Sequence, residues 1–396
     1  MRIDLITKEY PPHIYGGAGV HVSELVKVLR KTIEVQVRCF GDDRDEKDTS
    51  SYAHPNIFES ANPALQTLAT DLSMVSDIAG ADLVHSHTWY ANFAGQVASQ
   101  LHGIPHLITA HSLEPLRPWK ADQLGGGYRV SSWIEQSAYS SASGIIAVSH
   151  GMRSDILRAY PDIDPNKVSV VHNGIDLAAF QTVRDPDLVR SLGVDPDLRS
   201  VLFVGRITQQ KGLPYLLKAA RNLPADVQIV LCAGAPDTAE IQQRVIDLVE
   251  ELRRTRQNVI WIERHLARNE LVALLSSATV FACPSIYEPL GIVNLEAMAC
   301  AVPVVATATG GIPEVVEDGV TGILVPIEQV QDGSGKPIDE AKFVEDFAAA
   351  LSHALDQADL GSMGVAGRQR VESLFSWERI AADTIEVYRG AIDSFA

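Results

Sequence analysis

The stretch Val280-Phe-Ala-Cys-Pro-Ser-Ile-Tyr-Glu288-Pro-Leu-Gly-Ile-Val-Asn-Leu-Glu296 reads as a strand, a loop and the start of a helix. Residues 280–284 form a short apolar run, which is typical of a buried strand, and residues 290–300 have the apolar spacing of a helix. We therefore expect Glu288 on the loop and Glu296 on the helix. Such a loop opens at the carboxyl end of a strand, where α/β sheets bind ligands.

The same alternation of strand and helix patterns extends through the whole chain. Short apolar runs, most of them separated by helical sequence, occur at residues 3–7, 35–40, 83–85, 106–110, 145–149 and 168–172, and again at 201–204, 227–232, 259–262, 280–283, 304–306 and 322–325. This pattern predicts parallel, doubly wound sheets, so the fold class is α/β.

A polar stretch broken by prolines, residues 181–197, separates the two series of strands. A chain of 396 residues is long for one core, so we place a linker there. The prediction is two Rossmann-like domains facing a cleft, residues 1–182 and 198–375. A last helix, residues 376–396 with Ser376 as its cap, is expected to pack back onto the first domain.

Composition excludes several classes of function. The 50 acidic and 33 basic residues give a formal charge of −17, which disfavours nucleic acid or an anionic membrane as a partner. The four cysteines form no CxxC pair and lie among apolar neighbours, as reduced core thiols do. The first residues lead straight into a strand pattern, and no segment has the length of a membrane span, so we expect a cytoplasmic protein.

Two glycine-bracketed segments are candidates for binding phosphate. Gly205-Arg206-Ile-Thr-Gln-Gln-Lys211-Gly212 follows a predicted strand, and its two cations suit a departing diphosphate. Tyr15-Gly16-Gly17-Ala18-Gly19 opens a helix, where backbone N–H groups can approach phosphate, although a tight packing turn explains it equally well. Because no convincing D-x-D cluster accompanies the cations, we expect them to replace Mg²⁺ and predict no metal and no cofactor.

Glu288 and Glu296 suit hydrogen bonds to sugar hydroxyls. A glycosidase would also use two carboxylates, but it needs no phosphate-binding cations beside them. A nicotinamide oxidoreductase would need GxGxxG, which the first loop does not supply. A sugar-binding protein and a sugar-nucleotide epimerase remain as alternatives from other classes.

Jointly, these motifs resemble the retaining GT-B glycosyltransferases with the E-x7-E signature, specifically bacterial glycogen synthases. The matching pieces cover nearly the full length, and the string from Thr109 to Lys120 with Gly125-Gly-Gly-Tyr128 resembles the actinobacterial branch, which includes α-maltose-1-phosphate synthases. The resemblance implies glucose transfer from ADP-glucose, with UDP-glucose as the other donor, to glycogen or another α-1,4-glucan, or alternatively to glucose 1-phosphate. It leaves the oligomeric state open, with a homodimer as one option.

The resemblance also implies roles for individual residues. His111, Arg206, Lys211 and Glu288 would be catalytic, with the His111 side chain at the glucose 6-hydroxyl, the two cations on the departing ADP and Glu288 at the 3-hydroxyl. The donor would further contact Gly16, Gly17, Arg264, His265, Leu266, Leu290, Gly291 and Glu296, with Glu296 at the ribose and the backbone of residues 264–266 at the base. The loop Lys8-Glu-Tyr-Pro-Pro-His-Ile-Tyr-Gly-Gly departs from the Lys-x-Gly-Gly of enteric glycogen synthases, so the resemblance assigns no lysine contact there.

The acceptor should dock on the first domain. We expect its site to contain His87, Trp89, Arg117, Trp119, Lys120 and Tyr128, because aromatic rings stack on sugars and cations hold phosphate. His85, His106 and His172 read as structural residues at strand ends, and His13 and His21 stay undecided. His85 and His87 could bind metal, but no third ligand can be assigned from the sequence.

Overall fold

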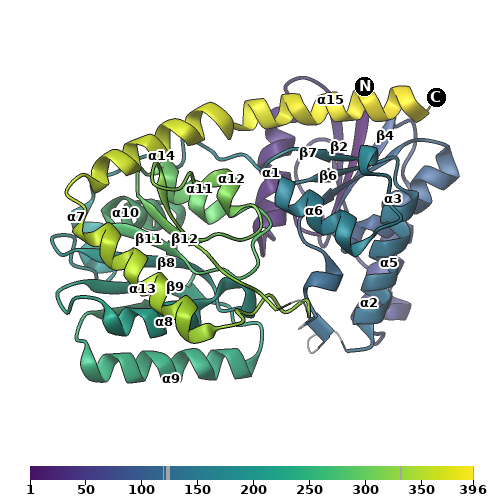
Figure 1. The fold of residues 1–396 in the computed structure, drawn as a ribbon. Coiled ribbons are helices and arrows are strands. Elements are labelled where there is room, and N and C mark those ends of the chain that lie inside the picture. Colours follow the sequence, from purple (N-terminus) through teal and green to yellow (C-terminus); the bar gives the residue numbers. More distant parts are fainter. Residues whose placement is uncertain (119, 122–124, 331, 396) are drawn as a thin grey trace. The chain divides into compact units, whose positions relative to one another are not determined.

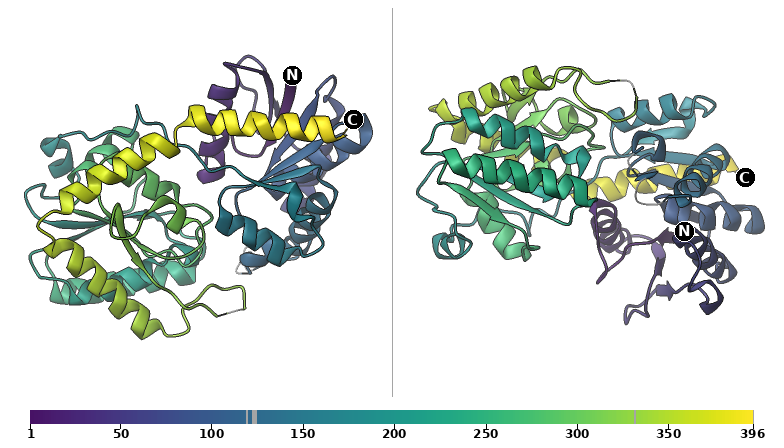
Figure 2. Two further views of the ribbon diagram at one scale, coloured as in Figure 1. Left: turned by 45° about the horizontal axis from the view of Figure 1, so that its top comes forward. Right: turned by 90° about the horizontal axis from the view of Figure 1, so that it is seen from below.

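The computed structural model describes residues 1–118, 120–121, 125–330 and 332–395. The chain divides into two compact units, Met1–Gly174 with Trp377–Ala396 and Ile175–Ser376. Each unit is built on one parallel sheet covered by helices (Figures 1 and 2).

The first unit has a seven-stranded sheet in the order β3-β2-β1-β4-β5-β6-β7. All of its neighbouring strands pair in parallel, as the alternating pattern predicts. The strands are β1 (Arg2–Thr7), β2 (Glu34–Phe40), β3 (Thr49–Tyr52), β4 (Leu83–His87), β5 (His106–Ala110), β6 (Gly144–Ala147) and β7 (Val168–Val170), and the helices are α1 (Gly17–Leu29), α2 (Pro63–Ser76), α3 (Trp89–His102), α5 (Gly127–Ser141), α6 (His150–Ala159) and α15 (Trp377–Phe395).

Apolar side chains fill both faces of this sheet. One cluster joins β1 and β2 to α1 and α15, and another joins β1 and β4 to α2 and α3. The last helix, α15, lies beside α1 (Figure 1) and buries Ile380, Ile385 and Tyr388 in the first of these clusters. The C-terminal helix thus completes the core of a unit whose other elements all belong to Met1–Gly174.

The second unit has a six-stranded parallel sheet in the order β10-β9-β8-β11-β12-β13. Its core lies between the sheet and the helices α8, α9 and α13. The strands are β8 (Ser200–Arg206), β9 (Gln228–Gly234), β10 (Val259–Ile262), β11 (Val280–Cys283), β12 (Val304–Thr307) and β13 (Gly322–Val325), and the helices are α7 (Pro186–Ser191), α8 (Leu213–Ala219), α9 (Ala239–Thr255), α10 (Arg268–Ser277), α11 (Ile292–Ala299), α12 (Ile312–Val315), α13 (Glu340–Asp356) and α14 (Leu360–Leu374).

Several local features differ from the sequence patterns. Strand β3 was not predicted, because Thr49-Ser-Ser-Tyr52 is a half-buried edge strand without an apolar run. The stretch 181–197 contains the helix α7, which Asp185 caps by accepting a hydrogen bond from Leu188 N–H at 3.0 Å. Strand β4 continues to His87 rather than ending at residue 85, so its last polar residues are buried within the ladder.

Candidate active site

Lys211 and Glu288 form a largely buried ion pair in the second unit. Lys211 ends the short 3-10 turn η4 (Gln209–Lys211) that follows β8, and Glu288 lies on the loop between β11 and α11. Lys211 Nζ donates to Glu288 Oε2 at 2.6 Å, and Ser285 Oγ donates to the same oxygen at 3.2 Å. Burial alone lowers the pKa of Lys211, but the attraction of Glu288 contributes to a net rise above its usual value. The ammonium group is therefore charged.

Gly212 allows the loop after β8 to approach the end of β11. Its φ is +66°, and a Cβ at this position would lie 1.9 Å from the carbonyl oxygen of Pro284. Only glycine fits such an approach. Ile286 N–H also donates to the carbonyl oxygen of Gln210 at 2.8 Å, so backbone contacts hold the two loops together and bring Lys211 to Glu288.

Arg206 is the last residue of β8, at the carboxyl end of the sheet. Its Nη1 donates to Asp237 Oδ1 at 3.1 Å, and 30% of its side chain is exposed. Asp237 belongs to the loop after β9, the neighbouring strand. The ion pair fixes the guanidinium at the same sheet edge as Lys211, as expected for a pair of phosphate-binding cations.

Glu296 is a half-buried residue of α11, the helix that follows the Glu288 loop. Burial raises the pKa of its carboxyl to about 7, although the positive charges of Lys211 and Arg268 oppose the change. At the start of this helix, Gly291 has φ +100° and Leu290 is buried. The predicted donor residues 288–296 therefore form one continuous loop and helix turn.

The segment proposed for base contacts follows β10. Arg264 donates through Nη1 and Nη2 to the two carboxylate oxygens of Glu270, at 2.8 and 2.7 Å, and Leu266 is buried. The ring of His265 is exposed. The side chains of Arg264 and Leu266 thus contact the protein itself, and the predicted contact of this backbone with the base stays a prediction.

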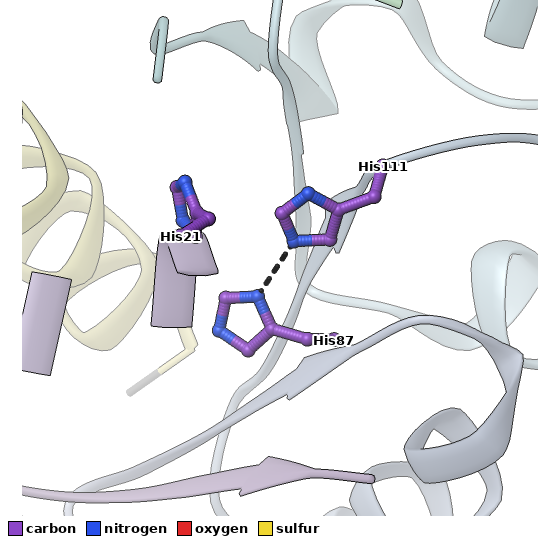
Figure 3. Close-up of side chains that lie close together, drawn as sticks. All are labelled: His21, His87 and His111. Carbon is purple, nitrogen blue, oxygen red and sulfur yellow. Dashed lines mark hydrogen bonds between the residues drawn. The ribbon is translucent and has the colours of Figure 1, made fainter. Parts of the chain in front are cut away.

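Three histidines of the first unit lie close together (Figure 3). His21 lies on α1, His87 ends β4 and His111 follows β5. His87 Nδ1 lies 3.0 Å from His111 Nε2, and one ring nitrogen of each of the three residues lies within 4.8 Å of the others. Burial lowers the pKa of His21 to about 4 and holds the pKa values of His87 and His111 well below the usual range. All three rings are therefore neutral at pH 7.

This grouping combines His87 with His21 and His111, a set that the sequence did not reveal. Three neutral imidazoles at such spacing could hold a transition metal ion, whose nitrogen ligands lie about 2.0–2.1 Å away. His85 is not part of the set, because its Nδ1 pairs with Tyr388 and its Nε2 with Thr109. His106 Nε2 similarly lies 2.7 Å from Ser86 Oγ.

The backbone amides of the glycine loop before α1 already bind a carboxylate of the protein itself. Tyr15 N–H and Gly16 N–H each donate to Glu9 Oε2 at 2.8 Å. Gly17 is the first residue of α1. A carboxylate thus accepts from the amides at this end of the helix, where a negative charge is favoured.

The segment after β5, which was predicted to bind the acceptor, is anchored by a buried acidic network. Arg117 pairs with the buried carboxylate of Glu114, and Ser131 Oγ donates to the other oxygen of Glu114 at 2.6 Å. Glu135 Oε1 accepts from Glu114 N–H at 2.8 Å and from the hydroxyl of Tyr160. Burial raises the pKa of Glu135 to about 8, and the charge of Glu114 adds to the rise. The network fixes the position of Arg117.

The other predicted acceptor residues differ in their surroundings. Trp89 is only 3% exposed and packs beside Ile134, so its ring belongs to the core rather than to an open surface. Tyr128 donates its hydroxyl to the carbonyl oxygen of Glu114 at 2.7 Å. Lys120 is half-buried, and Trp119 lies outside the residues that the structure describes.

Sequence reasoning gave no role to Lys8, Glu9, Glu114 or Glu135. The one sequence signal was the position of Lys8 directly after the first strand, because ligands bind at the carboxyl ends of the strands in such sheets. Glu135 bonds to Glu114 and Tyr160, which lie 21 and 25 positions away, so no local motif predicts this network, whereas Glu9 bonds to the nearby Tyr15 and Gly16.

Two family models match the chain and together cover most of it. "Glycosyltransferase Family 4" matches residues 15–179, and "Glycosyl transferases group 1" matches residues 185–339. The α-maltose-1-phosphate synthase of Mycolicibacterium smegmatis is 51% identical over 393 residues, covering 98% of this chain and 99% of that protein. The chain belongs to the retaining GT-B glycosyltransferases of family 4.

Other members of the glycosyltransferase family are more distant. The D-inositol 3-phosphate glycosyltransferase of Salinispora arenicola is 32% identical over 332 residues, which is 79% of this chain and 70% of that protein. The structure of sucrose-phosphate synthase from Thermosynechococcus elongatus superposes with a TM-score of 0.78 at 25% identity and covers 99% of each chain. The predicted fold class and enzyme class are thereby confirmed. Within the described part of this glycosyltransferase, no helix is long and apolar enough to cross a membrane.

Proposed function

We propose that this glycosyltransferase is an α-maltose-1-phosphate synthase, which transfers glucose from ADP-glucose to glucose 1-phosphate with retention. The observation that carries the proposal is 51% identity to a synthase of that name over nearly the full length of both chains. The resemblance to glycogen synthases implied a glucan acceptor, with glucose 1-phosphate as the alternative. The relatives support this alternative, because the names of the α-maltose-1-phosphate synthase and of the D-inositol 3-phosphate glycosyltransferase both include a phosphorylated compound.

The second unit would bind the nucleotide half of the donor. Arg206 and Lys211 would contact the diphosphate, whose negative charge grows as the bond to glucose breaks. Glu288, held by Lys211, would accept a hydrogen bond from the 3-hydroxyl of glucose, and Glu296 would accept from the ribose. The backbone of residues 264–266 would contact the base. The ion pairs of both cations preset their positions, so little reorganisation is needed during the reaction.

In the first unit, His111 would face the transferred glucose. The His111 ring would hydrogen-bond the 6-hydroxyl, and its carbonyl oxygen would face the anomeric carbon. A neutral His111 suits this place because it adds no positive charge beside a carbon that becomes positive. Gly16 and Gly17 would present backbone N–H groups to the diphosphate, for which the Glu9 carboxylate is a competitor.

Retention follows from attack on the face that the diphosphate leaves. The bond between the anomeric carbon and the diphosphate oxygen breaks, and its electron pair stays on the diphosphate. A hydroxyl of the acceptor then forms the new bond on the same face, and its proton passes to the departing diphosphate oxygen. This route requires no nucleophile from the protein and no metal.

A product analysis tests the proposal. Purified protein is given ADP-glucose or UDP-glucose, each with glucose 1-phosphate, with glycogen and without acceptor, and products are identified by NMR spectroscopy and mass spectrometry. We expect a disaccharide phosphate with an α linkage from ADP-glucose and glucose 1-phosphate. Glucan elongation without that product would establish a glycogen synthase instead, and interconversion of the donor sugar without acceptor would identify an epimerase.

A further inference from the structure

Lys8 is the first residue after β1, at the carboxyl end of the central strands of the first unit. In the register of the sheet, Thr7 pairs with His87, and His87 pairs with Thr109. The residues that follow these three positions therefore leave the sheet at one level. Because neighbouring strands lie about 4.8 Å apart, the backbone of Lys8 is roughly 10 Å from the segment that carries His111.

The side chain of Lys8 is positioned by an aromatic ring. Its Nζ lies 3.8 Å from the centroid of the Tyr90 ring, which is the distance of a cation–π contact. Tyr90 belongs to the first turn of α3, and its ring contacts that of buried Trp89 in a tilted arrangement with 4.1 Å between the centroids. The ammonium group thus rests on a surface that the core holds in place.

Partial burial lowers the pKa of Lys8 and the charge of Glu9 opposes this change, but Glu9 forms no ion pair with Lys8 in the described part of the chain. Glu9 directs its Oε2 to the amides of Tyr15 and Gly16. In the described part of the chain, Lys8 forms no ion pair with a carboxylate, whereas the cations of Arg117, Arg206 and Lys211 each have an acidic partner. Lys8 is also exposed to solvent. It is therefore a fixed positive charge that can accept an anionic ligand.

Charged groups of two segments also act on this ring. Burial raises the pKa of Tyr90, the positive charge of Arg117 opposes that rise, and the negative charges of Glu114, the ion-pair partner of Arg117, and of Glu9 add to it. Arg117 enters from the segment after β5, and Lys8 from the end of β1. An ammonium group held over an aromatic ring at this edge of the sheet matches a phosphate monoester attached to a sugar better than an uncharged glucan.

We propose that Lys8, held over Tyr90, binds the phosphate group of the acceptor. The inference rests on the proposed function, because it requires a phosphorylated acceptor, and it adds a residue that distinguishes sugar phosphates from neutral glucans. Lys8 supplies charge and up to three N–H donors to the phosphate oxygens. Tyr90 sets the position of the ammonium group.

Lys8→Ala and Lys8→Arg test the assignment. Lys8→Ala should raise the KM for glucose 1-phosphate by about 10- to 100-fold, as expected for a lost charge-assisted contact, while kcat at saturating acceptor and the KM for the donor stay within about twofold. Lys8→Arg keeps the charge, so its KM for glucose 1-phosphate should stay within about fivefold of that of the parent protein. Lys27→Ala is the matched control, because Lys27 is an exposed lysine of the same unit that pairs with Glu24.

A neutral acceptor separates a phosphate contact from a general structural effect. With maltose in place of glucose 1-phosphate, the slow transfer rate should be the same in Lys8→Ala and in the parent protein. Equal losses with both acceptors, or an unchanged KM for glucose 1-phosphate, would overturn the assignment of Lys8.

A direct binding measurement tests the assignment of Lys8 independently of the proposed function. Calorimetry measures the affinity for glucose 1-phosphate and for inorganic phosphate in the absence of donor. Weaker binding of both by Lys8→Ala supports the site even if the enzyme elongates only glycogen. Synthesis of maltose 1-phosphate with unaltered binding by Lys8→Ala would sink the site and leave the function intact, and no binding of either anion by the parent protein would refute the site.

Discussion

The hydroxyl of Tyr388 lies 2.8 Å from Nδ1 of His85, although 303 residues separate them in the chain. Both side chains are fully buried. The contact joins the C-terminal helix to a central strand of the first unit, and Thr109 occupies the other ring nitrogen of His85. This helix is thereby tied to the strand that ends in His87.

Tyr388→Phe should reduce the free energy of unfolding by about 1–3 kcal/mol, because it leaves one buried nitrogen of His85 without a partner. Denaturant unfolding monitored by tryptophan fluorescence measures the change. Tyr15→Phe is the control. Because Tyr15 is 63% exposed, removing its hydroxyl should reduce the free energy of unfolding by less than about 0.5 kcal/mol. Equal effects of the two substitutions would contradict the structural role of Tyr388.

Gly212→Ala should impair both stability and turnover. Its Cβ would collide with the carbonyl oxygen of Pro284, so the loop must move and carry Lys211 away from Glu288. Gly319→Ala is a matched control, because Gly319 has a similar φ of +72° but no atom within 4 Å of the added Cβ. That control should cost only the left-handed strain of about 1–2 kcal/mol and leave kcat unchanged. Thermal unfolding and initial rates distinguish the two variants.

Arg206→Ala should lower kcat by roughly 10²–10³-fold, because the departing diphosphate loses one preorganised cation. Arg221→Ala provides the comparison. Arg221 pairs with exposed Glu251 elsewhere in the same unit, so its removal should leave kcat within about twofold. Steady-state kinetics with saturating donor and acceptor measure both, and near-normal turnover in Arg206→Ala would exclude it from the mechanism.

The pH dependence of Glu296→Gln should reveal the raised pKa of Glu296. A carboxyl whose pKa rises on folding binds its proton more tightly in the folded chain, so its contribution to stability falls as pH increases from 4.5 to about 7. Glu296→Gln removes this loss and should be more stable than the parent protein at pH 8 but not at pH 4.5. The KM for ADP-glucose should rise at pH 8, because the ribose loses a charged acceptor.

Glu135→Gln serves as the comparison for Glu296→Gln. Burial raises the pKa of Glu135 to about 8, so its replacement should also improve stability at alkaline pH. Among the described residues, its side chain accepts hydrogen bonds from Glu114 and Tyr160 of the first unit, and the KM for ADP-glucose should stay the same. A rise in donor KM in both variants would show that the effect is not specific to Glu296.

Metal ions should be dispensable for turnover yet able to inhibit it. We expect dialysis against EDTA to leave kcat unchanged, because Arg206 and Lys211 supply the charge on the diphosphate. Added Zn²⁺ should inhibit at pH 7, since the three neutral imidazoles of His21, His87 and His111 can bind it and block His111. His21→Ala should raise the inhibitory zinc concentration at least tenfold, and unchanged inhibition would disprove binding at this cluster.

The sequence alone determined the architecture and one half of the proposed site. Strand and helix periodicities specify parallel sheets, because each pattern reports which face of a local element is buried. Residues 288–296 were predicted correctly as a loop and helix because all of the information is local. Edge strand β3 was missed, since a half-buried strand of Thr, Ser and Tyr has no apolar run.

Tertiary structure decided which side chains meet. Lys211 and Glu288 lie 77 positions apart in sequence, and their contact depends on Gly212 approaching Pro284. The cluster of His21, His87 and His111 and the contact of Lys8 with Tyr90 arise because parallel strands bring their carboxyl ends to one edge. Periodicity reports the burial of each element separately, whereas strand order and register set these distances, and they emerge only when the sheet is assembled.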